Sequence, residues 1–128
     1  AMVFNGGFAY SGGLCGALTG AALAVGQLAE RSLADHAIAK RQARHIIINL
    51  KEQFTCKFGS SECRILSGYD FSVPDEHEQF IEAGKWKQDC TDQILFVVEY
   101  LSDISITCFA EILNHICKTL LRKSCVRF

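Results

Sequence analysis

The sequence predicts an all-α protein, a compact bundle of five or six helices, and two observations lead to this prediction. Apolar residues recur with a period near 3.6 in four segments, which is the repeat of a helix with one buried face. The chain also has a single Pro, few β-branched runs and no clear period-2 alternation, so strands are hard to place. At 128 residues it forms one helical domain that buries roughly two-thirds of the surface of its unfolded form.

The first helix is expected over about residues 13–30. Its apolar side chains alternate in spacing between four and three residues, which defines a single buried stripe. The members of this stripe are Leu14, Leu18, Ala21, Val25 and Leu28. On a neighbouring face, Gly16 and Gly20 form a small-xxx-small pair that lets another backbone come close.

The second helix is expected over about residues 32–58. Its buried stripe is formed by Ala39, Ala43, Ile46, Ile47, Leu50, Phe54 and Phe58. Ile38 and Ile48 lie off this stripe, so the helix is expected to contact more than one neighbour. Gly59 is expected to end it, and either Ser60 or Ser61 to cap a short helix that contains Cys63.

The remaining helices follow from turn and cap signals. After a turn over residues 68–71, Ser72 has the position of a cap with Pro74 in the first turn, and a helix of about ten residues ends near Gly84. Asp89 is expected to cap the next helix, in which one face carries Cys90, Ile94, Val97, Val98 and Leu101, so that Cys90 points inward. An additional C-terminal helix over about 104–123 has an apolar side formed by Ile106, Phe109, Ala110, Leu113, Cys117, Leu120 and Leu121.

Charge and composition exclude several classes of partner. Lys and Arg number 13 against 14 Asp and Glu, and no long basic run is present, so no nucleic-acid partner is expected. No charged residue precedes Glu30, but glycines and polar residues make this stretch too weakly apolar for a membrane span. Residues 1–2 resemble an expression scar and a start Met, and they are left out of the fold prediction.

Cysteine usage indicates a reducing compartment. Seven cysteines is an odd number, and the chain has no cleavable leader, so a secreted disulfide framework is disfavoured and a cytoplasmic location is expected. The sequence has no GxSxG elbow, no P-loop and no GxGxxG that follows a strand. The usual motifs of hydrolases and nucleotide-binding enzymes are therefore missing.

Three cysteines, Cys15, Cys63 and Cys90, lie at the first turns of three expected helices. Free N–H groups and the positive end of the helix dipole favour the thiolate there, so a lowered thiol pKa is expected. Thiolates serve redox chemistry and soft metals, but the spacing fits no local zinc knuckle. If folding brings the three turns together they form one cluster; otherwise they are three unrelated small residues.

The other sulfur and imidazole groups give weaker signals. Cys117 is expected in the core, and Cys56, Cys108 and Cys125 lie on flanks or in the tail. His115 and Cys117 point apart on a helix and form no local metal pair. His36, His45 and His77 lack ligand-type partners at i, i+4 and are expected at the surface or in caps.

Three motifs, in residues 13–21, 59–70 and 84–90, occur in the order and spacing of a known family. Over about residues 6–101 the chain resembles the redox-active proteins named for the pattern C, GCAxxG, C and C. The resemblance implies a small helical protein with a bound metal or iron–sulfur group and redox chemistry. It matches Cys15 to the cysteine of the Gly-rich motif, and Cys63 and Cys90 to the two later cysteines, whereas the family's first cysteine is missing from this chain.

These observations support two hypotheses. In the first, the chain is a thiol-based redox protein or a metal-binding protein in which Cys63 and Cys90 come close enough to cross-link or share a ligand, and Cys15 is a third thiol in the same cavity. Its cofactor would be zinc, an iron–sulfur cluster or none, and its partner an oxidoreductase. In the second, it is a non-catalytic helical interaction module that has lost the redox site. A homodimer is expected in both, because the charge-free first helix lacks the cover that the family's missing N-terminal helix would provide.

Overall fold

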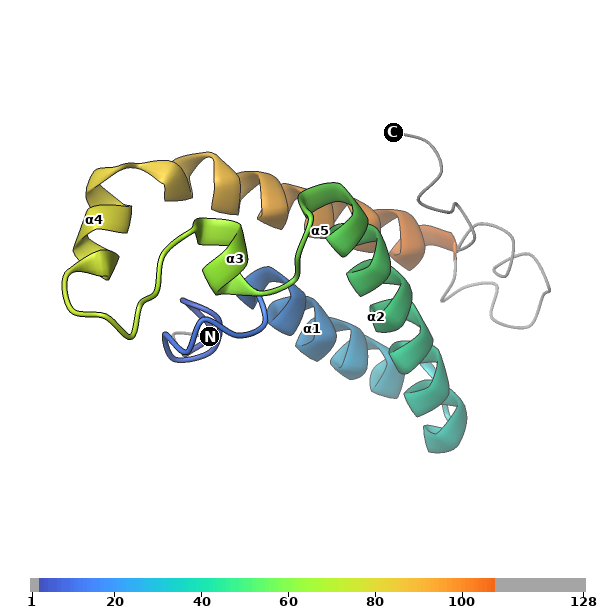
Figure 1. Cartoon of the computed structure of the whole chain (residues 1–128). Helices are drawn as coiled ribbons and strands as arrows, with labels where there is room; N and C mark the ends of the chain where they lie inside the picture. Colours follow the sequence, from blue (N-terminus) through green and yellow to red (C-terminus); the bar gives the residue numbers. More distant parts are fainter. Residues whose placement is uncertain (1–2, 108–128) are drawn as a thin grey trace.

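The computed structural model describes residues 3–107, in which helices are joined by loops and turns (Figure 1). The elements are α1 Gly16–Ser32, α2 His36–Phe58, α3 Cys63–Ser67, α4 Glu76–Glu82, the 3₁₀ helix η1 Lys85–Lys87, and α5 Asp89–Thr107. Within this range there are no strands, which confirms the all-α prediction. Most of the additional C-terminal helix expected over 104–123 lies outside the described residues. Residues 104–107 continue α5 without the break expected before Ile104.

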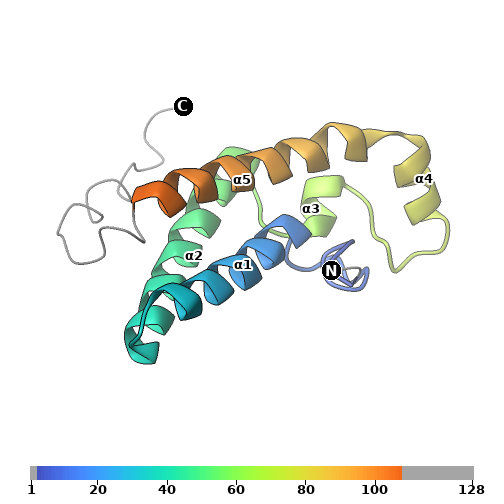
Figure 2. The same cartoon turned by 180° about the vertical axis from the view of Figure 1, so that it is seen from behind.

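The core lies where α5 packs against the hairpin of α1 and α2 (Figures 1 and 2). Buried residues from the three helices form two neighbouring clusters. One contains Cys15, Leu18, Ala21, Leu50, Phe54 and Val97, and the other Val25, Ile46 and Ile104. The stripes expected on the first two helices are therefore confirmed at most of their positions, with Leu14 and Leu28 at the exposed margin.

The buried face of α5 differs from the expected one. Val97 is buried as expected, but Ile94 and Val98 remain 51% and 52% exposed. The face that meets the core contains Gln93, Val97 and Ile104. Ile94 and Val98 were assigned to this face wrongly, because Gln93 is polar and was not counted in the apolar pattern, whereas Leu101 packs against the core as expected.

Two helix starts also differ from the sequence prediction. The expected second helix began four residues too early, because α1 runs to Ser32 and α2 begins only after Asp35, whose Oδ1 accepts a hydrogen bond from the Ile38 N–H at 2.9 Å. Gly59 ends α2 with φ 83°, as predicted. Neither serine caps α3: its N-cap is Glu62, whose N–H donates to Ser60 Oγ at 3.0 Å.

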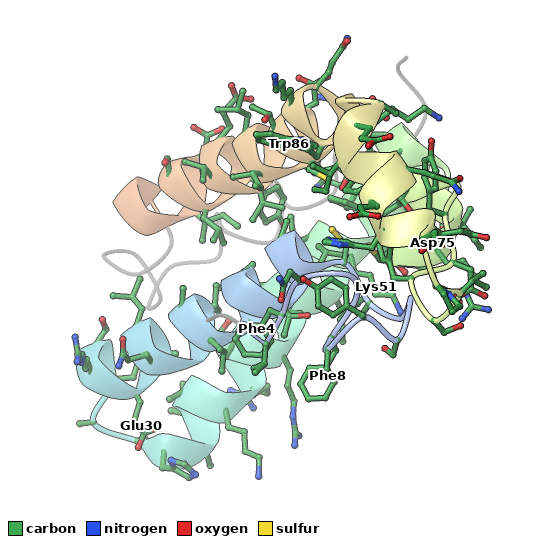
Figure 3. The ribbon with its side chains drawn as sticks, turned by 90° about the vertical axis from the view of Figure 1, so that its left-hand side faces the viewer. Phe4, Phe8, Glu30, Lys51, Asp75 and Trp86 are labelled. Carbon is green, nitrogen blue, oxygen red and sulfur yellow. The ribbon has the colours of Figure 1, made fainter. Side chains whose placement is uncertain are left out.

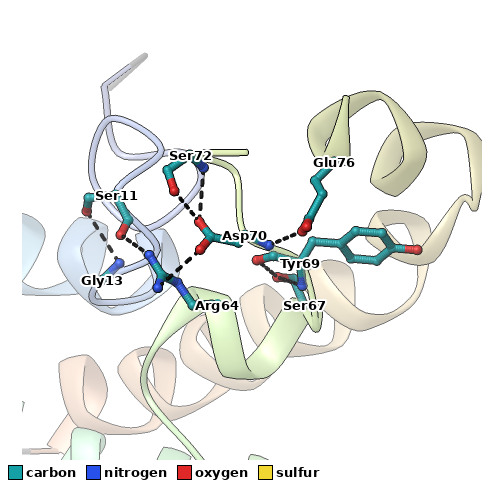
Figure 4. Close-up of polar contacts among 8 residues, drawn as sticks. All are labelled: Ser11, Gly13, Arg64, Ser67, Tyr69, Asp70, Ser72 and Glu76. Atoms are coloured by element: carbon teal, nitrogen blue, oxygen red, sulfur yellow. Dashed lines mark hydrogen bonds and ion pairs between the residues drawn. The ribbon is translucent and has the colours of Figure 1, made fainter. Parts of the chain in front are cut away.

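Ser72 does not cap a helix. Its hydroxyl donates to Asp70 Oδ1 at 2.6 Å, and α4 begins only at Glu76, after Asp75 in a left-handed conformation (Figure 4). The Asp70 N–H donates to the Glu76 carboxylate. The local hydrogen bonds of Asp70 therefore hold residues 70–75 in a turn where a cap was expected, and α4 has seven residues.

The chain's own N-terminal loop covers part of the Gly-rich face of α1. A Cβ at Gly16 would lie 2.6 Å from the carbonyl oxygen of Phe4, so glycine permits this contact. The sequence indicated that such a small residue lets another backbone approach, and at Gly16 that backbone belongs to the same chain. At Gly20 a Cβ would meet nothing within 4 Å. None of the helices in residues 3–107 is long and apolar enough to cross a membrane.

Candidate functional site: a cavity with three thiols

An isolated antiparallel bridge between Leu14 and Glu62 places Cys15 near Cys63. The Cys15 N–H donates to the Ser61 carbonyl at 2.8 Å, and the Cys63 N–H donates to the Gly13 carbonyl at 2.7 Å. Each cysteine therefore directly follows a bridge residue. Because α1 and α3 both begin at this bridge, two segments far apart in the sequence start their helices side by side.

The N-terminal loop packs directly against this bridge. A Cβ at Gly7 would lie 2.6 Å from the Gly13 backbone and 2.7 Å from the Cys63 Cβ, and the φ of Gly7 is +75°. Only glycine fits such a position without displacing its neighbours. Arg64 strengthens the arrangement, since its guanidinium pairs with Asp70 at 3.2 Å and donates to the Ser11 carbonyl at 3.4 Å (Figure 4).

The third cysteine, Cys90, comes from the start of α5. It lines one cavity of about 510 Å³ together with Cys15 and Cys63. Cys15 is buried and the other two are half-buried, and all three are free. Folding therefore brings together the three cysteines that the sequence singled out, which was one of the two outcomes left open.

Aromatic side chains form much of the cavity wall. Phe4 and Tyr10 come from the N-terminal loop, Phe71 and Phe80 from the turn before α4 and from α4 itself, and Trp86 from η1. Figure 3 shows Phe4 beside α1 and Trp86 near the start of α5. Tyr10 meets Phe71 edge-on with ring centroids 6.1 Å apart, and Phe71 meets Phe80 at 5.2 Å. The thiols thus lie in largely apolar surroundings.

This environment overturns the expectation of lowered thiol pKa values. Burial raises the pKa of Cys15, although hydrogen bonds from the backbone of α1 act in the opposite direction. Burial, and then the neighbouring Cys15 and Cys90, raise the pKa of Cys63 to about 11. Burial, Cys15 and Asp89 likewise raise the pKa of Cys90. Desolvation and mutual repulsion outweigh the helix starts, so all three side chains are protonated thiols at neutral pH.

Gln93 is a cavity residue that the sequence analysis missed. Its side chain is buried, and its Oε1 accepts a hydrogen bond from the Cys15 thiol at 3.5 Å. It lies one helical turn after Cys90 on α5, so the two side chains line the cavity together. The sequence did contain a signal for Gln93, because a polar residue three positions after a cysteine at a helix start lies on the same helix face.

The histidines divide between the cavity and the surface. His77 lines the cavity, with its ring 5.0 Å from that of Tyr10 and 5.7 Å from that of Phe71. His77 is exposed, as the sequence predicted, but its place at the cavity was not predictable because Tyr10 comes from another part of the chain. His36 pairs with Glu30 at an exposed position, and His45 contacts Asn49, as expected for surface residues.

The arrangement of ligand-type side chains bears on the predicted metal centre. Across the described part of the chain, no group of three or more His, Cys, Asp or Glu side chains has an arrangement that could hold a metal ion. Zinc or iron–sulfur binding by Cys15, Cys63 and Cys90 stays a prediction. Cys56 is exposed on α2 and does not line the cavity, whereas Cys108, His115, Cys117 and Cys125 lie outside the described residues.

Comparison with known proteins adds one finding. The model of a family described as "Putative redox-active protein (C_GCAxxG_C_C)" matches residues 1–104. This range includes all three cavity cysteines and every segment that lines the cavity. No curated protein and no solved structure matches the chain.

Proposed function

The chain belongs to the redox-active protein family of the C_GCAxxG_C_C pattern, and from this premise we propose that its cavity thiols form a dithiol–disulfide redox centre. The observation that carries the proposal is that the three free cysteines line one cavity. Two thiols that form a disulfide release two protons and two electrons, and an oxidant must accept them. Cys63 and Cys90 are proposed as the pair, with Cys15 as the third thiol.

The surroundings of the thiols support a slow, gated reaction. Attack on a disulfide requires a thiolate, whereas burial and mutual repulsion raise the pKa of all three groups. The reduced centre is therefore slow to exchange with disulfides in solution. An oxidoreductase partner, or a ligand that enters the cavity, would be needed for fast turnover.

Equilibration with dithiothreitol tests this proposal. The reduced protein is incubated without oxygen in mixtures of oxidised and reduced dithiothreitol, so that one protein disulfide forms for each oxidised dithiothreitol consumed. Free thiols are then trapped in acid, and peptide mapping locates the disulfide. We expect a disulfide between Cys63 and Cys90, lost in Cys63→Ser and Cys90→Ser but kept in Cys56→Ser, because Cys56 belongs to a separate disulfide and does not line the cavity.

Other results of this experiment would change the proposed pair or the proposed function. A disulfide that includes Cys15 would keep the redox centre but change the pair. No disulfide between cavity cysteines in any mixture would favour the non-catalytic interaction module.

Elemental analysis after anaerobic purification tests the metal prediction: about one equivalent of zinc or iron per chain, lost in Cys63→Ser, would support a metal centre.

A further inference from the structure

The wall of the thiol cavity carries no Lys, Arg, Asp or Glu among the described residues. A charged ligand would leave water here without gaining an opposite charge, which is costly. Nucleotide cofactors and glutathione disulfide carry phosphates or carboxylates and therefore fit poorly. The cavity volume of about 510 Å³ is in the range that accepts a small organic molecule.

The arrangement of the rings favours a flat ligand. Tyr10, Phe71 and His77 contact one another edge-on, with interplanar angles of 72–83°. Trp86 lines the same space and is the single Trp of the chain. Aromatic walls of this kind contact planar rings by stacking or by edge-to-face packing. Across the cavity, Gly20 adds no side chain, and a Cβ there would meet nothing within 4 Å.

Gln93 supplies a polar anchor within these apolar walls. It is 94% buried and lines the cavity, and its Oε1 accepts a hydrogen bond from the Cys15 thiol. The Nε2 of this amide is a hydrogen-bond donor, so a ligand that brings a carbonyl oxygen can pair with it. The amide therefore selects for a hydrogen-bond acceptor on the ligand.

From these three features we propose that the cavity binds an uncharged, planar molecule that carries a carbonyl group, of the quinone class. The chemistry of this ligand rests on the proposed redox function, but its binding does not. Two cavity thiols would transfer two electrons and two protons to one quinone, forming an S–S bond and a hydroquinone with two O–H groups. Reactants and products are all neutral, so an uncharged cavity holds both states.

Binding is measured by quenching of Trp86 fluorescence with 2,3-dimethyl-1,4-naphthoquinone. The Cys63→Ser/Cys90→Ser variant is used because it cannot form the proposed disulfide, so binding is separated from oxidation. We expect saturable quenching, weakened about tenfold or more for the ring-sulfonated analogue. Equal affinity for the sulfonated analogue, or no saturable quenching, would overturn the proposal.

A pair of glycine substitutions on α1 tests the location. Gly20→Leu places a side chain at the cavity wall, whereas Gly26→Leu makes the same change at a position that does not line it, and both positions are open at Cβ. Leucine favours the helix at both sites, so folding is retained. We expect roughly tenfold weaker binding in Gly20→Leu alone. Unchanged affinity in Gly20→Leu would place the quinone elsewhere and refute the site.

The wild-type protein separates the two proposals. Mixed with the quinone without oxygen, it should form one hydroquinone for each disulfide. Quinone binding without disulfide formation by either the quinone or oxidised dithiothreitol would refute the redox function and leave the binding site standing. A disulfide that forms with oxidised dithiothreitol, without any quinone binding, would support the redox function and refute the quinone site.

Discussion

At Cys15, two influences on the thiol pKa act in opposite directions. Free N–H groups at a helix start stabilise a thiolate, and Cys15 receives such bonds from the backbone of Ala17 and Leu18. Desolvation acts against them and dominates at all three sites. For Cys63 the two other thiols add further repulsion, because a second negative charge in the same cavity is unfavourable.

The pH dependence of alkylation tests this balance. Because the pKa of Cys63 rises from 9.0 to about 11, the folded protein holds roughly one hundredth of the ordinary thiolate fraction at pH 7.5. Iodoacetamide should therefore react slowly with Cys63 at neutral pH, and the rate should climb until about pH 11. Alkylation is stopped at set times, and peptide mass spectrometry gives the rate at Cys63 as a function of pH. Urea-unfolded protein serves as the reference. A midpoint below that of the unfolded chain would contradict the assignment.

Gly7 is the backbone position on which Cys63 most depends. Gly7→Ala adds a Cβ that collides with the Gly13 backbone and with the Cys63 side chain, at φ +75°. Gly68→Ala has nearly the same φ, +74°, but meets open space. We expect a loss in the free energy of unfolding of about 1–2 kcal/mol for Gly68→Ala from backbone strain alone, and a clearly larger loss for Gly7→Ala. Urea denaturation measures both, and equal losses would show that the contact with Cys63 is loose.

At the scale of elements, the bridge between residues 13–15 and 61–63 sets the register of α1 against α3. The exchange rates of the backbone amides should show whether this bridge is formed in solution. The N–H groups of Cys15 and Cys63 are paired across the bridge, whereas that of Leu14 donates to no described group. We expect exchange at Leu14 to be roughly a hundredfold faster than at Cys15 and Cys63. Similar rates at all three amides would mean that the bridge opens frequently in solution.

The same bridge explains what the sequence could and could not predict. The helical period revealed the buried faces of α1 and α2, because Leu18, Val25 and Leu50 repeat as a helix requires. A single bridge leaves no periodic pattern, so the contact of Cys15 with the start of α3 was not predictable from spacing. The resemblance to the family named the three thiols, but the raised pKa values depend on tertiary burial. Gln93 was missed because a pattern of apolar residues does not register a buried amide.

At the scale of the molecule, the cavity belongs to no single element. The N-terminal loop, the starts of α1, α3 and α5, and α4 each contribute side chains to it. The three thiols therefore come together only when the whole fold has formed. Loosening the N-terminal loop or α4 would open the cavity to water, which would lower the thiol pKa values toward their ordinary range.

The outer surface of the helices leads to a prediction about assembly. Leu23 on α1 and Ile48 on α2 remain 58% and 56% exposed, and α5 exposes Ile94, Leu95 and Val98. Apolar side chains in such number favour a second copy of the chain as cover, and a two-fold symmetric dimer is the simplest closed arrangement. Light scattering at micromolar concentration should give twice the chain mass of 14.2 kDa.

A charge placed on α1 tests whether its exposed face takes part in that dimer. Leu23→Glu should weaken the dimer roughly a hundredfold or more, because a two-fold dimer loses the burial of two leucines, each of which stabilises by about 1.5–3 kcal/mol. Gln27→Glu adds the same charge one turn further along α1 at an exposed polar position and should change the association much less. A mass of 14.2 kDa for the unmodified chain would refute the homodimer. A dimer unaffected by Leu23→Glu would move the contact to α2 or α5, where Ile48 and Val98 are the next residues to test.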